Sequence, residues 1–123
     1  MTRRLIVEAD GGARGNPGPA AYGALVRDPQ TGEVLAEVSE AIGVSTNNVA
    51  EYRGVIAGLA LARDIDPTAR VDVRLDSRLI VEQMSGRWKI KNSALKPLAL
   101  EAHRIMPPDQ VTYTWVPREQ NRH

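Results

Sequence analysis

One stretch of helical periodicity, residues 47–65, divides the chain and restricts the folds that are open to it. Apolar side chains recur there at helical spacing, while Thr46 in front is a good N-cap residue and Asp66-Pro67 behind can stop a helix. Strand-like segments lie on both sides of this helix. Since a helix between two strands can carry the chain across a sheet, we expect residues 5–9 and 70–76 to form parallel neighbouring strands.

Three strand-like segments precede the helix and are separated by turn-forming residues. They are rich in apolar and β-branched side chains and span residues 5–9, 20–27 and 33–42. Residues 11–19 hold four glycines and two prolines, which predicts a loop, and residues 28–32 predict a turn. We therefore expect an antiparallel meander whose first strand ends at Asp10.

The segments after the long helix predict one further strand, two helices and a last strand. Residues 70–76 alternate apolar and polar side chains, as in a strand with one buried face. Ser77 can cap a short helix that runs through Met84, and residues 93–106 predict a helix with a proline in its first turns. Residues 110–116 predict the last strand. The order βββαβααβ indicates an α/β or α+β layered fold in one domain.

Length and composition exclude several classes of protein. The 123 residues suit one domain, and 42% hydrophobic with 25% charged residues is ordinary for a globular chain. No apolar run approaches the ~20 residues of a membrane helix, and the short apolar start is unlike a secretory signal. The absence of cysteine excludes disulfides and thiolate zinc sites. We expect a cytoplasmic monomer that does not associate with membranes.

The charges are unevenly distributed although the net charge is only +1. Residues 28–66 contain seven acidic and two basic side chains, whereas residues 78–104 contain six basic and two acidic ones. Trp88 lies within the basic stretch. A basic stretch around an aromatic residue points to a phosphate backbone, but a solvated helix face explains the charges alone equally well.

Three acidic residues occupy positions where they could meet. Asp10 and Asp76 each follow a predicted strand, and Glu51 lies about one turn inside the long helix. If the two strands are parallel neighbours, their carboxyl ends lie side by side, where ligands bind in open α/β sheets. Three carboxylates there would form an oxygen-ligand site suited to Mg²⁺ or Mn²⁺. Taken singly, an Asp at the end of a strand is more often a turn or cap residue, and a Glu in a helix is usually solvated.

Four motifs resemble, in order and in spacing, those of type 1 ribonuclease H. They are D-G-G-A-R-G-N-P-G-P at residues 10–19 with A-Y-G at 21–23, T-N-N-V-A-E-Y at 46–52, L-D-S at 75–77 with L-I-V at 79–81, and W-V-P-R-E-Q-N at 115–121. The resemblance covers essentially the whole chain. It implies a five-stranded mixed sheet, three strands antiparallel and two parallel, with helices on both faces. It also implies an endonuclease that cuts the RNA strand of RNA–DNA hybrids and leaves 5′-phosphates.

The resemblance further implies roles for particular residues. Asp10 would bridge two Mg²⁺ ions, with Mn²⁺ as a substitute, while Glu51 and Asp76 would hold one of them. Residues expected to contact the nucleic acid are Gly12, Arg14, Gly15, Asn16, Thr46, Asn47, Asn48, Trp88, Lys89, Lys91 and Asn92. The glycines would let the backbone approach the ribose, and the residues from Trp88 onward resemble the region of the family that binds the DNA strand. For the asparagines, turn and cap roles remain an alternative.

The chain departs from the family pattern at its end. The family's fourth carboxylate and final helix are expected beyond His123, so we expect residues 1–123 to be one ribonuclease H domain that is shortened at its C-terminus. The family's histidine loop is not matched, although His123 could serve in product release. A further domain after His123 is compatible with the resemblance.

Two other functions compete with a hybrid-specific ribonuclease. The missing carboxylate would suit a module that binds nucleic acid with little turnover. A nuclease of the same fold that resolves DNA junctions is a third possibility, but the D-G-G loop and the N-x-x-x-E-Y helix argue against it. Cleavage of labelled hybrid, compared with duplex DNA and duplex RNA, would separate the three.

Overall fold

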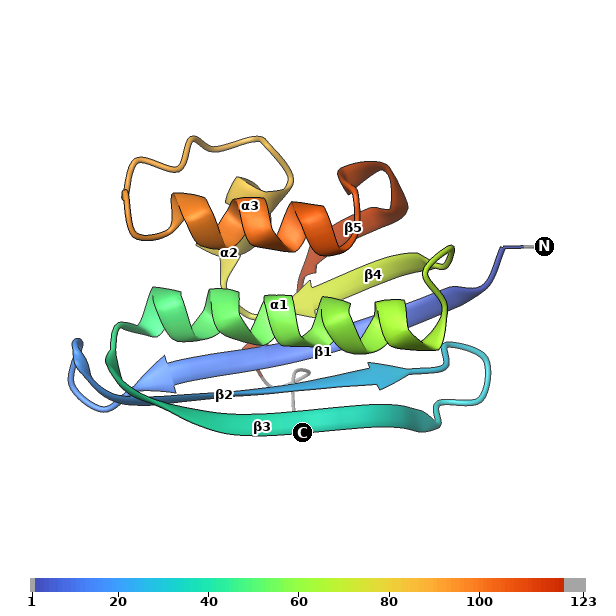
Figure 1. The fold of residues 1–123 in the computed structure, drawn as a ribbon, viewed down its shortest axis with the longest axis horizontal. Coiled ribbons are helices and arrows are strands. Elements are labelled where there is room, and N and C mark those ends of the chain that lie inside the picture. Colours follow the sequence, from blue (N-terminus) through green and yellow to red (C-terminus); the bar gives the residue numbers. More distant parts are fainter. Residues whose placement is uncertain (1, 119–123) are drawn as a thin grey trace.

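The computed structural model describes residues 2–118, which form one sheet with helices packed against it (Figure 1). The strands and helices, in chain order, are β1 (Arg4–Ala13), β2 (Gly18–Arg27), β3 (Val34–Ser45), α1 (Asn47–Ile65), β4 (Arg70–Leu75), α2 (Arg78–Met84), α3 (Lys96–Ile105), the short 3-10 helix η1 (Pro108–Gln110) and β5 (Val111–Trp115). The expected order of strands and helices is confirmed.

The sheet has the strand order β3-β2-β1-β4-β5. Strands β1, β2 and β3 pair antiparallel, whereas β4 pairs parallel with both β1 and β5. Val7 on β1 is in register with Val73 on β4, which is in register with Tyr113 on β5. The parallel pairing of the first and fourth strands across the long helix is therefore confirmed.

The hairpin between β1 and β2 is longer than expected. Strand β1 continues past Asp10 to Ala13, because residues 11–13 pair with residues 20–22 of β2. The Arg14 amide donates to the Pro19 carbonyl at 2.9 Å and closes the remaining loop. Gly11 faces helix α1, where a Cβ would overlap the Ala50 carbonyl, so this glycine allows close packing of the helix.

Helix α1 spans residues 47–65 as predicted, whereas α3 and β5 are both shorter than expected. The Thr46 side chain accepts the Val49 amide at 3.3 Å and caps α1. Before α3, the Asn92 side chain accepts the Ala94 amide at 2.8 Å and forms a turn, so the helix begins at Lys96 rather than Ser93. The segment around Pro108 forms η1, and β5 therefore begins at Val111.

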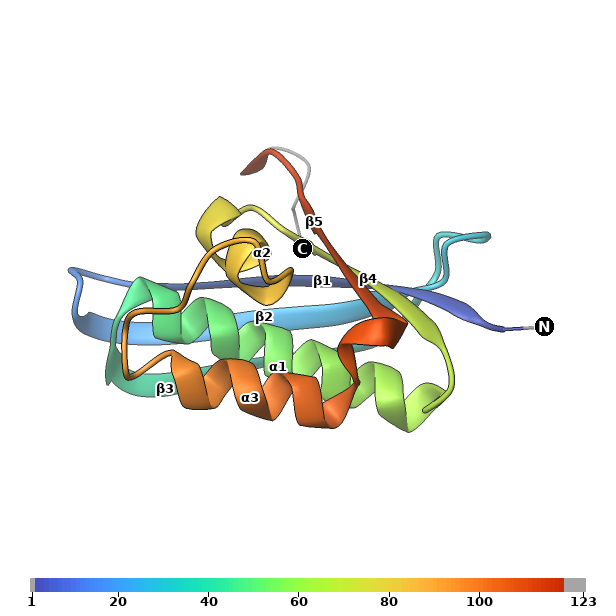
Figure 2. The same ribbon diagram turned by 90° about the horizontal axis from the view of Figure 1, so that it is seen from above.

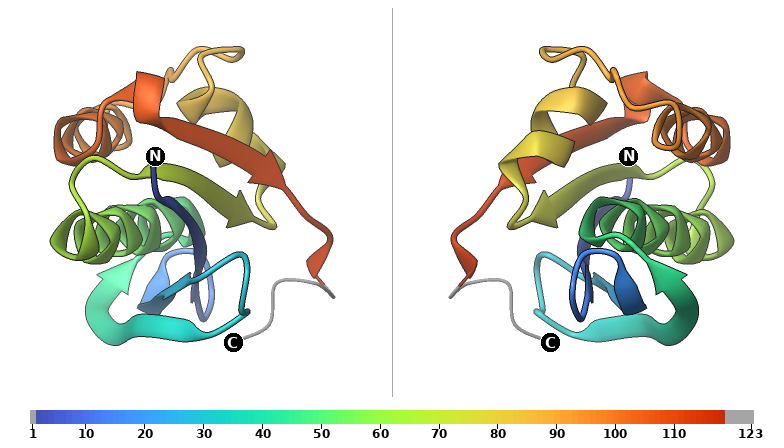
Figure 3. Two further views of the ribbon diagram at one scale, coloured as in Figure 1. Left: turned by 90° about the vertical axis from the view of Figure 1, so that its right-hand side faces the viewer. Right: turned by 90° about the vertical axis from the view of Figure 1, so that its left-hand side faces the viewer.

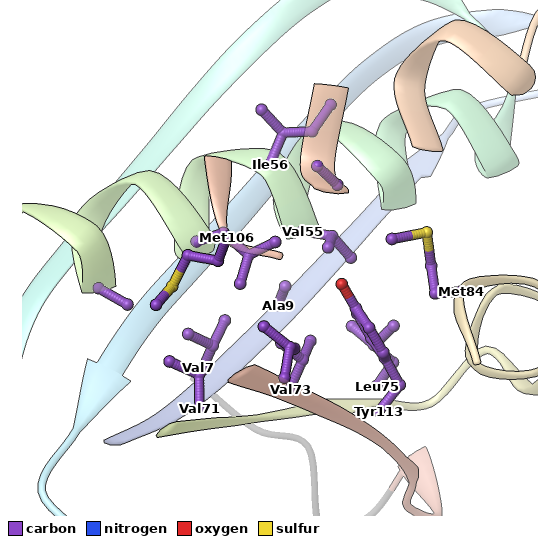
Figure 4. Packing of buried hydrophobic residues seen from close by; sticks show 14 of the residues in the cluster. Val7, Ala9, Val55, Ile56, Val71, Val73, Leu75, Met84, Met106 and Tyr113 are labelled. Atoms are coloured by element: carbon purple, nitrogen blue, oxygen red, sulfur yellow. The ribbon is translucent and has the colours of Figure 1, made fainter. Parts of the chain in front are cut away.

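The hydrophobic core lies on one face of the sheet. Val7, Ala9, Val73 and Tyr113 project from the strands toward Val55 of α1 (Figure 4). Helices α1 and α3 lie side by side over this face (Figures 1 and 2), and α2 sends buried side chains into the same core. Burial of these apolar side chains is the main stabilising contribution to the fold.

The opposite face of the central strands is polar. Glu8 forms an ion pair with Arg27 at 2.9 Å, and Asp72 accepts hydrogen bonds from Thr112 and Thr114 at 3.0 and 2.7 Å. The end view shows α1 and α3 together on the other side of the sheet (Figure 3). The five-stranded mixed sheet with packed helices is thus confirmed, and α1, α2 and α3 all contribute side chains to the core on one face of this sheet.

No helix within residues 2–118 has both the length and the apolar character needed to cross a membrane.

Candidate metal centre

Three carboxylates from distant parts of the chain converge at one end of the sheet. Asp10 comes from β1, Glu51 from α1 and Asp76 from the end of β4, and one oxygen of each lies within 4.8 Å of the others. The register brings Asp10 and Asp76 together, because Glu8 is paired with Arg74 in the parallel pair of β1 and β4, and each aspartate lies two residues further along the chain. The sequence predicted these three residues and the edge at which they meet.

Glu51 is the buried member of the cluster and is held toward β1. Its Oε1 accepts the Gly11 amide at 3.2 Å, whereas its Oε2 is buried without a hydrogen-bond partner among the described residues. Burial, followed by the charges of Asp76 and Asp10, raises the pKa of Glu51 to about 8 despite the hydrogen bond from Gly11. A divalent cation could be coordinated by the unpartnered oxygen and would compensate the negative charges of the three carboxylates, so the site fits such an ion.

Asp76 is contacted from the end of β5 in a way that the sequence did not reveal. Its Oδ2 lies 3.4 Å from Nε of Arg118, and its backbone carbonyl accepts the Trp115 indole N–H at 3.3 Å. The next residue, Ser77, caps α2 by accepting the Ile80 amide. Both contacting residues, Trp115 and Arg118, belong to the fourth motif, but nothing local in that motif indicates that they reach Asp76.

An open groove of about 1170 Å³ begins at the carboxylates and runs over the hairpin. Of the residues expected to bind nucleic acid, Gly12, Arg14, Asn47 and Asn48 line this groove. Its floor also includes the small residues Ala20, Ala21, Gly23 and Ala41. Because small side chains leave room, the groove can admit a bulky ligand next to the carboxylates.

Several of the expected nucleic-acid contacts instead hold the hairpin to the start of α1. The Asn47 amide donates to Asn16 Oδ1 at 2.9 Å, and the Ala13 amide donates to Asn47 Oδ1 at 2.7 Å. Thr46 caps the helix, and Gly15 takes a positive φ of 66° in the turn. The side-chain carbonyl groups of Asn16 and Asn47 therefore have structural roles within the fold.

The residues after α2 form a surface apart from the groove. Trp88, Lys89 and Lys91 are exposed and are not among the groove-lining residues. Asn92 forms the turn before α3 through its side chain. The expected contributions of Glu119, Gln120, Asn121 and His123 lie outside the described residues.

Comparison with known proteins shows similarity over nearly the whole chain. Residues 8–123 match a family described as reverse transcriptase-like. A "Bifunctional protein Rv2228c" of Mycobacterium tuberculosis is 51% identical over 96% of this chain, which spans 32% of that protein. A "Ribonuclease HI" of Halobacterium salinarum is 37% identical over 96% of this chain and 59% of the relative. The chain thus spans about a third of its mycobacterial relative.

Solved structures share the fold. The N-terminal RNase H domain of Rv2228c superposes with a TM-score of 0.90 at 49% identity, covering 98% of this chain and 86% of the other. LC11-RNase H1 in complex with an RNA/DNA hybrid gives a TM-score of 0.88 at 40% identity, covering 95% and 88% of the two chains.

Proposed function

The chain belongs to the ribonuclease HI family, and we propose on that basis that it is an endonuclease that hydrolyses the RNA strand of RNA–DNA hybrids and leaves 5′-phosphates. The observation that carries the proposal is the convergence of Asp10, Glu51 and Asp76 within 4.8 Å beside an open groove. A relative of the same fold, LC11-RNase H1, is bound to an RNA/DNA hybrid, which supports this class of substrate. We propose that residues 1–123 belong to one such domain.

The three carboxylates would hold Mg²⁺, or Mn²⁺ in its place, with Asp10 shared between two ions and Glu51 and Asp76 holding one of them. When bound, the ions would lower the pKa of an attacking water and stabilise the leaving oxygen. The residues of the chain contribute position and charge. Gly11 orients Glu51 through its amide, while Trp115 and Ser77 fix the backbone that directly follows the Asp76 side chain.

Recognition of RNA requires contact with the ribose 2′-hydroxyl. Gly12 lines the groove next to Asp10, and its nearest neighbour would be 3.6 Å from an added Cβ, so its backbone is accessible. Asn48 also lines the groove, and its side chain has no hydrogen bond to another described residue. We propose that Gly12 and Asn48 contact the sugar edge of the RNA strand, with Arg14 at the rim.

The exposed Trp88, Lys89 and Lys91 would bind the other strand. Two ammonium groups beside an aromatic ring suit phosphates and the adjoining sugars. Since these residues lie apart from the groove, they would contact the hybrid while the carboxylates act on the RNA strand.

The decisive experiment is cleavage of an end-labelled RNA–DNA hybrid with and without Mg²⁺, alongside duplex DNA and duplex RNA of the same sequence. We expect Mg²⁺-dependent cleavage of the RNA in the hybrid alone. Asp10→Asn should abolish it, whereas Asp64→Asn, an exposed carboxylate at the other end of α1, should not. Hybrid binding without cleavage would instead support the binding module, and cleavage of duplex DNA would refute hybrid specificity.

A further inference from the structure

The side chain of Arg78 lies over the ring of Trp88, ten residues further along the chain. The guanidinium carbon is 5.9 Å from the centroid of the ring, within the range of a cation–π interaction. The segment after α2 folds back to allow this, because the amides of Arg87 and Trp88 both donate to the Glu82 carbonyl, at 2.9 and 3.2 Å. The pair is thus held by the backbone and not only by side-chain attraction.

The positive charge of Arg78 is only partly compensated by neighbouring carboxylates and is available to bind an anion. Arg78 faces the carboxylate of Glu82, whose oxygen lies 4.0 Å from Nε of Arg78. That carboxylate is already engaged by Arg87, through a short contact to Nε and a second bond of 3.2 Å to the terminal nitrogen. Since one carboxylate faces two guanidinium groups, this cluster carries an excess positive charge, and the Arg78 side chain is 69% exposed.

A cation–π contact leaves the N–H donors of the guanidinium free to bind an anion. A guanidinium that stacks on an aromatic ring presents its flat face to the ring, whereas its N–H groups point outward in the plane. Such a planar edge matches two oxygens of a phosphate. Because the ring already restricts the Arg78 side chain, less conformational entropy is lost when a phosphate binds. Arg78 is therefore prepared to accept a phosphate in a defined orientation.

The position of Arg78 links two surfaces that are otherwise separate. It follows Asp76 of the carboxylate cluster by two residues, and its ring partner is directly followed by Lys89. A hybrid with its RNA strand at the carboxylates and its other strand at the exposed lysines would bring a backbone phosphate to this guanidinium.

We infer that Arg78, oriented by Trp88, binds a backbone phosphate of the nucleic acid and joins the carboxylate site to the basic stretch as one continuous binding surface. The inference rests on the proposed function, because it supposes a nucleic acid at the carboxylates. It assigns to Arg78 a binding role and to Trp88 a positioning role in addition to any contact of its own.

The test is the salt dependence of hybrid binding, measured by fluorescence anisotropy without divalent ions between about 50 and about 300 mM salt. Arg78→Ala should lower the slope of log affinity against log salt by about one unit and weaken binding about five- to tenfold near 0.1 M salt. Arg63→Ala is the matched control, since it removes an exposed arginine from the last turn of α1 and should leave the slope unchanged.

Two further variants separate a phosphate contact from a structural role. Arg78→Lys should keep the slope, because the charge remains, but restore only part of the affinity, because an ammonium lacks the planar edge. Trp88→Leu should weaken binding in the wild-type chain and have a smaller effect in the Arg78→Ala chain, since the two residues act as a pair.

The outcomes distinguish this inference from the proposed function. A wild-type slope in Arg78→Ala, or an equal loss of slope in Arg63→Ala, would overturn the phosphate contact while hybrid binding itself stood. Additive losses in the double variant would overturn the positioning role of Trp88. Failure of the wild-type chain to bind any hybrid would overturn the proposed function, and this inference with it.

Discussion

The Gly11 amide donates a hydrogen bond to Oε1 of Glu51 at 3.2 Å, which ties strand β1 to the helix that crosses the sheet. The bond directs the carboxylate of Glu51 toward Asp10, the residue before Gly11. The other oxygen of Glu51 remains without a partner among the described residues, so the helix presents a buried acid to the cluster. The chemistry of the site and its effect on stability both depend on this arrangement.

Replacement of Glu51 by glutamine should change how stability depends on pH. The pKa of Glu51 is raised from 4.5 to about 8, so the folded chain keeps a proton that the unfolded chain releases. Without metal, the contribution of Glu51 to the free energy of unfolding is greatest below pH 4.5 and falls as pH rises toward about 8. In this window the free energy of unfolding of Glu51→Gln, relative to that of the wild type, should rise by at most about 1.4 kcal/mol per pH unit. Urea unfolding at several pH values measures the difference, and a pH-independent difference would contradict it.

Binding of a divalent ion should strengthen as pH rises. A ligand carboxylate must lose its proton to bind a cation, and the raised pKa of Glu51 means that a proton is displaced below about pH 8. Calorimetric titration with Mn²⁺ should show tighter binding and less proton release from pH 6 toward pH 8, in buffers of different ionisation enthalpy. Asp76→Asn should weaken binding at every pH, whereas the exposed Asp64→Asn should not. Equal metal affinity in Asp76→Asn and the wild type would show that Asp76 is not a ligand of the ion.

Alanine at Gly11 should be far more harmful than alanine at its neighbour. A Cβ at Gly11 would overlap the Ala50 carbonyl of α1, whereas one at Gly12 would have its nearest neighbour at 3.6 Å. We expect Gly11→Ala to destabilise the fold by about 1–3 kcal/mol and to weaken metal binding by displacing Glu51. Gly12→Ala should change stability by less than about 0.5 kcal/mol. Thermal unfolding and metal titration of both variants test this, and similar losses in the two would argue against the close packing of α1 on Gly11.

Two buried tyrosines should respond in opposite ways to loss of their hydroxyl groups. The Tyr52 hydroxyl donates to Gln83 Oε1 at 2.8 Å and links α1 to α2, whereas the Tyr113 hydroxyl is buried without a partner among the described residues. Tyr52→Phe should lower the free energy of unfolding by about 1–2 kcal/mol, because it leaves the amide oxygen unsatisfied. Tyr113→Phe should be neutral or stabilising. Denaturant midpoints compare them, and the reverse order would exclude this hydrogen-bond assignment.

The adjacent residues Asn47 and Asn48 should separate stability from binding. Asn47→Ala removes the acceptor of the Ala13 amide and should destabilise the hairpin by about 1 kcal/mol. Asn48→Ala should leave stability nearly unchanged but weaken hybrid binding more than duplex DNA binding, if this side chain contacts the ribose. Thermal unfolding together with anisotropy on both duplexes measures the pair. Wild-type affinity of Asn48→Ala for both duplexes would show that Asn48 lines the groove without contacting the ribose.

Local patterns were sufficient for much of the fold and for the three acidic residues. Helix α1 was predicted at its observed bounds, because its apolar spacing and the Thr46 cap act within a few residues of each other. The parallel pairing of β1 and β4 followed from the crossover, and with it the meeting of Asp10 and Asp76. These features depend on chain geometry, which the order of residues already contains.

Tertiary structure alone decided the contacts that join distant residues. The Asn16 side chain is used by an amide 31 residues away, Arg118 reaches Asp76, and Arg78 lies over Trp88. Strand β1 passes Asp10 because β2 offers it partners, although its glycines predicted a loop. Hydrogen bonds and charge interactions depend on separation in space, which the spacing of residues along the chain does not specify until the sheet and helices are packed.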